Sequence, residues 1–206
     1  MASFIGVNMI KVIIFDYGNV VGNNPNTFIF KGVSKEFGID CNEIEHAYRK
    51  LIPRSQKDQI SEKDFWIVMS LSLGIDDPYK IREVWTKEYI KNSKIDKKVV
   101  SFVRRLRNWG YNVCLLSNMA NFYREISLSK EIEKEFSEVF YSYQLGARKQ
   151  EDGIYKIIVD KLHVEPQECI FIDDEEEALR NPREIGIETI LYQSLDKLES
   201  ELKEML

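Results

Sequence analysis

Cysteine, proline and long apolar runs are scarce in this sequence, and each shortage excludes a class of protein. The three cysteines, Cys41, Cys114 and Cys169, lie far apart and form no CxxC pair, which argues against a zinc ribbon and against a disulfide framework. The apolar stretch at residues 4–15 has no basic leader and is too short to span a bilayer. We therefore expect a soluble protein of the reducing cytoplasm, with no membrane partner.

Glycine and proline number only 10 and 5 in 206 residues, which argues against a disordered or low-complexity chain. The 34 acidic residues outnumber the 29 basic ones and give a net charge of −5, so the balance does not suggest a nucleic-acid partner. The length fits one folded core with an insertion. Composition is silent on the oligomeric state.

Five short apolar runs have the length of buried strands. They are residues 10–15, 113–116, 139–141, 170–172 and 187–191. Helical patterns alternate with the later runs: one is opened by Asp96 and closed by Gly110, a second occupies residues 154–162, and a third, at residues 195–206, follows the last run. This alternation predicts an α/β fold with a Rossmann-like, doubly wound parallel sheet.

The stretch between the first and second runs has no buried-strand pattern, and its helical patterns follow one another directly. Ser61 and Asp64 resemble a capping box at the start of one of these helices. We therefore predict an inserted all-helical cap domain at residues 24–95, which divides an α/β core domain formed by residues 1–23 and 96–206.

The residues that follow the apolar runs are polar, and in an open parallel sheet these positions line the ligand crevice. They are Asp16, Gly18, Ser117, Asn118, Lys149, Asp173 and Asp174. Three aspartates at one edge would repel each other unless a cation lay among them. Carboxylates without histidine or cysteine nearby suit Mg²⁺, while lysine, serine and backbone N–H groups suit a phosphate. The sequence therefore predicts magnesium-dependent phosphoryl transfer.

In their order these segments resemble the haloacid dehalogenase superfamily of hydrolases with an α-helical type I cap. The segments are FDYGNV, LLSN, LGARK and FIDD, and the resemblance covers residues 10–192. The first segment is most similar to the D-x-G-N-V branch, which includes sugar-1-phosphate phosphatases. The segment 58–65 and the pair Ile154-Tyr155 are similar to that branch as well. The resemblance implies a phosphatase of small-molecule phosphate esters, sugar phosphates among them.

The resemblance also implies a role for each motif residue. Asp16 would be the nucleophile that accepts the phosphoryl group as an aspartyl-phosphate. The catalytic residues would be Asp16, Ser117 and Lys149, and the phosphate would be bound by Ser117, Asn118 and Lys149. The Mg²⁺ site would comprise Asp16, the Gly18 carbonyl and Asp174, with Asp173 acting through a bound water or a hydrogen bond.

Three positions depart from the family pattern. Gly18 stands where most phosphatases of the superfamily carry an acid/base aspartate, and general acid catalysis is typically worth about 10² to 10⁴-fold. We therefore expect a preference for leaving oxygens that need little protonation, as in an anomeric sugar phosphate or an aryl phosphate. Ala178 replaces an asparagine, and Pro182 follows it closely, so we expect a helix to restart with Asn181 as its cap. Gln150 replaces the usual proline.

Two alternatives stay open. A 2-haloacid dehalogenase would use the same Asp16 nucleophile and would not need an acid at position 18, although the Asp173-Asp174 pair favours a metal that such dehalogenases lack. A binding or regulatory protein on a degenerate hydrolase scaffold would fit the departures from the family pattern.

Overall fold

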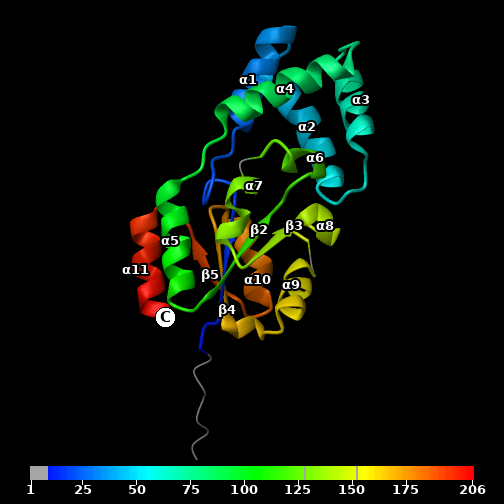
Figure 1. Cartoon of the computed structure of the whole chain (residues 1–206). Helices are drawn as coiled ribbons and strands as arrows, with labels where there is room; N and C mark the ends of the chain where they lie inside the picture. Colours follow the sequence, from blue (N-terminus) through cyan, green and yellow to red (C-terminus); the bar gives the residue numbers. More distant parts are fainter. Residues whose placement is uncertain (1–8, 128, 152) are drawn as a thin grey trace, which may run out of the picture.

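The computed structural model describes residues 9–127, 129–151 and 153–206 (Figure 1). Residues 1–8 of the predicted core segment therefore lie outside the described residues. In the described part of the chain, five parallel strands form one sheet in the order β3-β2-β1-β4-β5. The strands are β1 (Val12–Asp16), β2 (Asn112–Ser117), β3 (Glu138–Tyr141), β4 (Cys169–Asp173) and β5 (Glu188–Leu191). The predicted parallel sheet is confirmed, and each strand lies within two residues of its apolar run.

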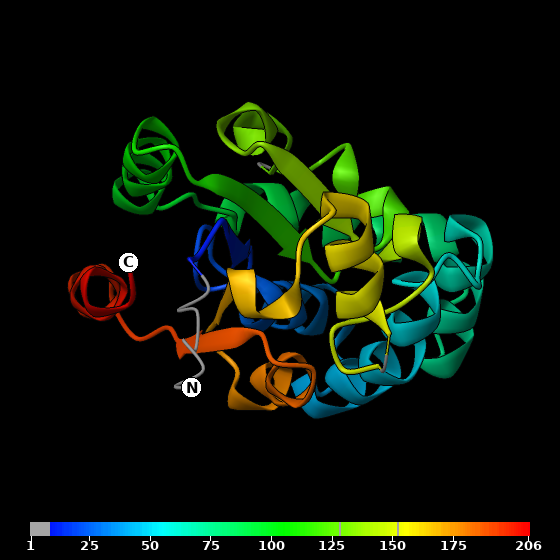
Figure 2. The same ribbon diagram turned by 90° about the horizontal axis from the view of Figure 1, so that it is seen from below.

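Helices cover both faces of the sheet, which explains why the strands are apolar throughout rather than alternating. One face is covered by α5 (Lys97–Asn108) and α11 (Leu195–Met205), and the other by α9 (Ile154–Leu162) and α10 (Arg180–Glu184) (Figure 2). Along β1, Ile13 and Phe15 pack under α5 and α11, whereas Val12 and Ile14 pack against α9. These two apolar layers hold the ends of the central strands in place.

The predicted start of α5 after Asp96 is confirmed, whereas the predicted start of α10 is wrong. The Asp96 carboxylate caps α5 by accepting hydrogen bonds from the N–H groups of Lys98 and Val99, and Gly110 follows in a left-handed conformation. The predicted restart at Asn181 is wrong, because α10 begins at Arg180 and has Leu179 at its cap position. Pro182 is then the third helical residue, where an N–H would lack a partner within the helix.

Between β1 and α5 the chain forms four consecutive helices, as predicted. They are α1 (Asn26–Phe37), α2 (Cys41–Ser55), α3 (Glu62–Ser72) and α4 (Pro78–Asn92). Aromatic side chains, among them Phe65, Trp66 and Trp85, build a separate core for them. This helical insertion lies over the carboxyl ends of the strands (Figure 1).

The two connections between the insertion and the sheet are paired with each other. The Asn23 N–H donates to the Lys94 carbonyl at 3.0 Å, and the Lys94 N–H donates to Asn23 Oδ1 at 2.6 Å. This pairing supports our proposal that residues 24–95 form a domain distinct from the sheet domain.

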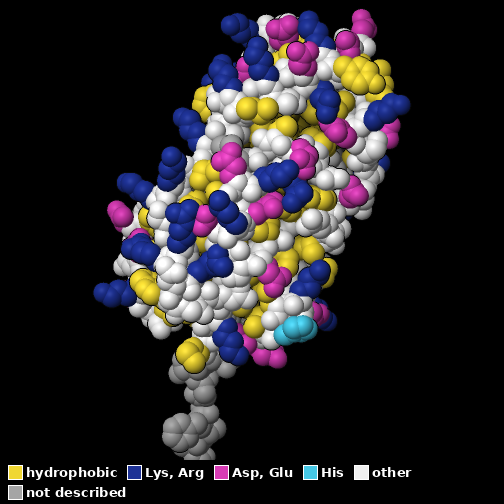
Figure 3. Space-filling model, in the orientation of Figure 1, with side chains coloured by type: hydrophobic (Ala, Val, Ile, Leu, Met, Phe, Trp, Pro, Cys, Tyr) yellow, Lys and Arg dark blue, Asp and Glu magenta, His cyan; other side chains and the backbone are white. Residues whose placement is uncertain are grey.

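Short helices complete the described chain. They are α6 (Asn121–Arg124), α7 (Ser129–Ile132), α8 (Ser142–Leu145) and the 3₁₀ helices η1 (Glu133–Glu135), η2 (Pro166–Glu168) and η3 (Glu176–Leu179). Among the described residues, no helix has the length and apolar character that crossing a membrane requires. Acidic and basic side chains are interspersed over the face shown in Figure 3.

Candidate active site at the carboxyl ends of the strands

A cavity of about 830 Å³ lies between the carboxyl ends of the strands and the helical insertion. Strands β1 and β4, whose ends border it, are the neighbours at which the strand order reverses, the usual position of the crevice in an open α/β sheet. From the sheet domain the predicted residues Asp16, Gly18, Ser117, Asn118, Lys149 and Asp174 line this cavity. Asp173 is fully buried and contacts Lys149.

The centre of the site is a buried cation between two buried carboxylates. Lys149 Nζ lies 2.8 Å from Asp16 Oδ1 and 2.6 Å from Asp173 Oδ2. Asp16 and Lys149 are each 5% exposed and Asp173 is 0% exposed. The two aspartates end adjacent strands, since Phe15 and Ile172, the residues before them, are partners in the register. The sheet therefore brings together residues that are far apart in the sequence.

Burial and charge oppose each other in this cluster. Burial raises the pKa of Asp16; the positive charge of Lys149 counteracts this effect and the negative charge of Asp173 reinforces it. Burial acts to lower the pKa of Lys149, but the attraction of Asp16 and Asp173 outweighs burial and the net shift is upward. One lysine thus faces two carboxylates, and a further cation would stabilise the ionised form of Asp16.

A third carboxylate extends the cluster towards the cavity. Asp16, Asp173 and Asp174 each offer an oxygen, and these three oxygens lie within 4.8 Å of one another. Both oxygens of Asp173 already accept hydrogen bonds, from Lys149 Nζ and from the Glu175 N–H at 2.9 Å. Three carboxylates with one lysine leave an excess of negative charge at hard oxygen ligands, and such a donor set fits Mg²⁺.

The loop after β1 is tied to the same cluster through Asn19. This residue has a φ of 53°, a left-handed conformation that asparagine tolerates better than most residues. Its side-chain amide donates to Asp174 Oδ2 at 3.0 Å, and its side-chain carbonyl accepts from the Asn24 N–H at 3.0 Å. Asn19 therefore joins the candidate metal ligand Asp174 to the segment that enters the insertion.

Gly18 has room for a Cβ. A Cβ placed there would meet Asp16 Oδ2 at 3.6 Å, an ordinary van der Waals distance. The backbone at this position therefore accepts a Cβ without a close contact.

Two of the phosphate-binding candidates, Ser117 and Asn118, lie at the end of β2, which neighbours β1 on the side opposite to β4. Ser117 ends β2 and is 5% exposed. Asn118 Oδ1 accepts from the Lys149 N–H at 3.0 Å, and Asn118 Nδ2 donates to Gln150 Oε1 at 2.8 Å. The Asn118 side chain thus fixes the turn that carries Lys149.

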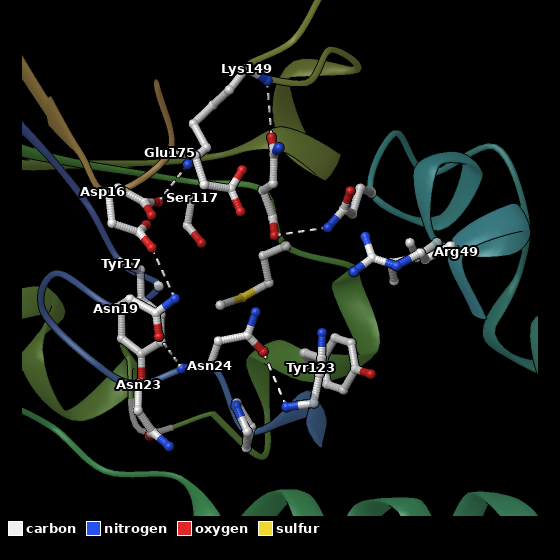
Figure 4. A pocket seen from close by; sticks show the side chains of 18 of the residues that line it. Asp16, Tyr17, Asn19, Asn23, Asn24, Arg49, Ser117, Tyr123, Lys149 and Glu175 are labelled. Atoms are coloured by element: carbon white, nitrogen blue, oxygen red, sulfur yellow. Dashed lines mark hydrogen bonds and ion pairs between the residues drawn. The ribbon is translucent and has the colours of Figure 1, made fainter. Parts of the chain in front are cut away.

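The sequence analysis did not assign several residues that line the cavity, among them Gln56, Arg148 and Glu175. The Glu175 side chain extends into the cavity beside Ser117 (Figure 4), and burial raises the pKa of its carboxyl group. Its position directly after Asp174 at a strand end was a signal that could have identified it. Gln56 gave no such signal, because it stands at the end of a helix, outside the four strand-end motifs.

The fold and the site therefore describe an α/β protein with a polar, carboxylate-rich cavity beneath a helical insertion. The family model for haloacid dehalogenase-like hydrolases matches residues 10–179, and the chain belongs to this family.

Curated relatives are remote in sequence. The D-ribitol-5-phosphate phosphatase of Bacteroides thetaiotaomicron is 24% identical over 191 residues, which cover 88% of this chain and 91% of that protein. Bifunctional epoxide hydrolase 2 of Sus scrofa is 26% identical over 138 residues, which cover 65% of this chain. The matched part is only 25% of that relative's length.

Solved structures share the fold. A HAD family enzyme from Bacteroides thetaiotaomicron, in complex with magnesium and inorganic phosphate, is similar with a TM-score of 0.75 and 22% identity. The similarity covers 92% of this chain and 98% of that one.

Proposed function

We propose that this protein is a magnesium-dependent phosphatase that hydrolyses phosphate monoesters of small molecules. The observation that carries the proposal is the buried Asp16–Lys149–Asp173 cluster with Asp174 beside it, at the base of a polar cavity. The similarity to a ribitol-phosphate phosphatase supports it.

In the proposed reaction, Asp16 is the nucleophile. A carboxylate oxygen of Asp16 bonds to phosphorus while the bond from phosphorus to the ester oxygen breaks, and the alcohol leaves after taking up a proton. Water then attacks the aspartyl-phosphate, which releases inorganic phosphate and a proton and regenerates the carboxylate. Lys149 restrains Asp16 and, together with the Ser117 hydroxyl and the loop of Asn118, binds the phosphate oxygens.

The residues around Asp16 would hold the metal. Asp16, Asp174 and the carbonyl of Gly18 would be its protein ligands, with Asp173 acting through a bound water or through its hydrogen bond to Lys149. When bound, Mg²⁺ supplies positive charge that neutralises the carboxylates and the phosphate. Asn19 would hold Asp174 in position for this role, because it already donates to the Asp174 carboxylate.

We infer that the leaving alcohol is polar. Besides the charged cluster, the cavity is lined by side-chain amides, among them Asn24 and Asn26, which can both donate to and accept from hydroxyl groups. A sugar or polyol phosphate fits such a wall. Since Gly18 supplies no acid, an ester whose leaving oxygen needs little protonation should react fastest.

Phosphate release from p-nitrophenyl phosphate and from a sugar 1-phosphate tests the proposal, with Mg²⁺ and with EDTA. We expect turnover that requires Mg²⁺, and a higher rate on p-nitrophenyl phosphate than on a simple alkyl phosphate. Halide release from a 2-haloacid would establish the dehalogenase instead. Tight binding of a phosphate ester without turnover would establish the non-catalytic scaffold.

A further inference from the structure

Gln56 joins the helical insertion to both loops that position the phosphate-binding residues. It follows the last residue of α2 and is partly buried. Its Nε2 donates to the Asn118 carbonyl at 3.1 Å, and its Oε1 accepts from Arg148 Nε at 2.8 Å. One side chain of the insertion thus contacts the loop after β2 and the turn that precedes Lys149.

The next residue makes a second contact with the same turn. Lys57 Nζ lies 2.7 Å from Glu151 Oε1. The other Glu151 oxygen accepts from the Arg148 N–H at 3.3 Å, and the Glu151 N–H donates to the Arg148 carbonyl at 2.9 Å. Gln56 and Lys57 therefore hold the turn 148–151 at both of its ends.

The turn held in this way carries Lys149, whose side chain reaches the proposed catalytic centre. The Lys149 N–H donates to Asn118 Oδ1, and Lys149 Nζ contacts Asp16 and Asp173. A displacement of Gln56 would release Arg148 and the Asn118 carbonyl together. Because the Lys149 side chain is only 6% exposed, packing leaves it little freedom to compensate for a displacement of its backbone.

We propose that Gln56 and Lys57 form a latch that couples closure of the helical insertion to the position of Lys149. Gln56 is a positioning residue, because it acts on Asp16 only through Asn118, Arg148 and Lys149. When the insertion is closed, the lysine is held at the nucleophile; when it swings away, both hydrogen bonds of Gln56 are broken. The kinetic consequence rests on the proposed phosphatase function, whereas the structural consequence does not.

The test uses Gln56→Met, which keeps the side-chain length and removes both hydrogen bonds, and Gln56→Glu, which keeps an acceptor for Arg148. Gln59→Met is the matched control, because Gln59 lies in the same segment and is exposed. Amide hydrogen exchange of Lys149 and Glu151 is measured for each variant, together with kcat and KM for a sugar phosphate. Lys57→Met and Gln56→Glu carry the test if Gln56→Met does not fold.

We expect faster exchange at both amides and a kcat about tenfold lower in Gln56→Met, a smaller change in Gln56→Glu, and wild-type behaviour in Gln59→Met. A purely structural role would lower the melting temperature without a selective change at the two amides. Exchange in Gln56→Met equal to that of the Gln59 control would overturn the latch. If the wild type hydrolyses no phosphate ester, the phosphatase proposal fails, while the exchange data still decide whether the latch exists.

Discussion

Two lysines near the cavity form ion pairs of nearly the same length in very different surroundings. Lys149 Nζ lies 2.6 and 2.8 Å from its two carboxylate partners, and Lys57 Nζ lies 2.7 Å from its one. The Lys149 side chain is 6% exposed and its partners 7% and 0%, whereas Lys57 and Glu151 are 21% and 37% exposed. From the distances between nitrogen and oxygen alone, the pairs of the two lysines would be expected to have similar energies.

The surroundings decide what each pair can do. A buried charge loses its hydration, so removal of its partner is expensive, whereas a pair in contact with water is screened and easily replaced. The Lys149 pair is therefore suited to hold a nucleophile in a fixed position. The Lys57 pair is suited to a contact that opens and closes.

The largest expected effect on turnover comes from a substitution in the buried cluster of Asp16, Lys149 and Asp173. Asp16→Asn removes the nucleophile while keeping the size of the side chain, and we expect kcat to fall by on the order of 10³-fold or more. Phosphate release with Mg²⁺ is the measurement, and circular dichroism checks that the variant is folded. Turnover close to that of the wild type would show that Asp16 is not the nucleophile.

Lys149→Met tests how much the buried ion pairs contribute to the free energy of unfolding. The variant leaves Asp16 and Asp173 buried without their cation, and we expect the free energy of unfolding to fall by about 3–5 kcal/mol in metal-free buffer. Mg²⁺ should restore part of this loss, because a cation that binds only the folded state stabilises it. Urea unfolding with and without Mg²⁺ measures both effects.

The matched control for Lys149→Met is the double variant that also carries Asp16→Asn. It buries one carboxylate fewer and should be less destabilised than the single variant. If Lys149→Met lowers the free energy of unfolding by less than about 1 kcal/mol, the buried ion pairs contribute no more to stability than an exposed pair does.

Gly18→Asp adds a carboxyl group to the buried side of the cavity. The position has room for a Cβ, and a proton donor there should raise kcat on a simple alkyl phosphate by about 10 to 100-fold, with a smaller gain on p-nitrophenyl phosphate. Gly18→Asn, which has the same shape and no acid, is the control. Equal gains in the two variants would show that the effect is not acid catalysis.

The sequence predicted most of the residues that the sheet contributes to the site. Apolar runs identify strands buried on both faces, and a parallel sheet places all their carboxyl ends at one edge, so Asp16 and Asp173 could be placed together from the sequence alone. The family resemblance implied the contact of Lys149 with Asp16, whereas its contact with Asp173 was not predicted and is a finding of the structure.

The contacts that the helical insertion makes with the site could not be predicted in this way. The contacts of Gln56 with Asn118 and Arg148 depend on how α2 lies over the sheet, which no local pattern encodes. The start of α10 was misplaced for a related reason. An Asn-Pro pair favours a helix cap locally, but here Leu179 packs into the core below α9, and the helix starts directly after it.

Lys57→Met should produce the smallest change in stability, and it measures the energy of the partly exposed ion pair. Because this pair is partly exposed, we expect the free energy of unfolding to change by only about 0–1 kcal/mol. The difference from the wild type should shrink as sodium chloride is raised from low to high concentration, since salt screens exposed charges. Urea unfolding at two salt concentrations measures it, with Lys149→Met in parallel. A loss in Lys57→Met as large as that in Lys149→Met would mean that pair length, and not burial, sets the energy of these contacts.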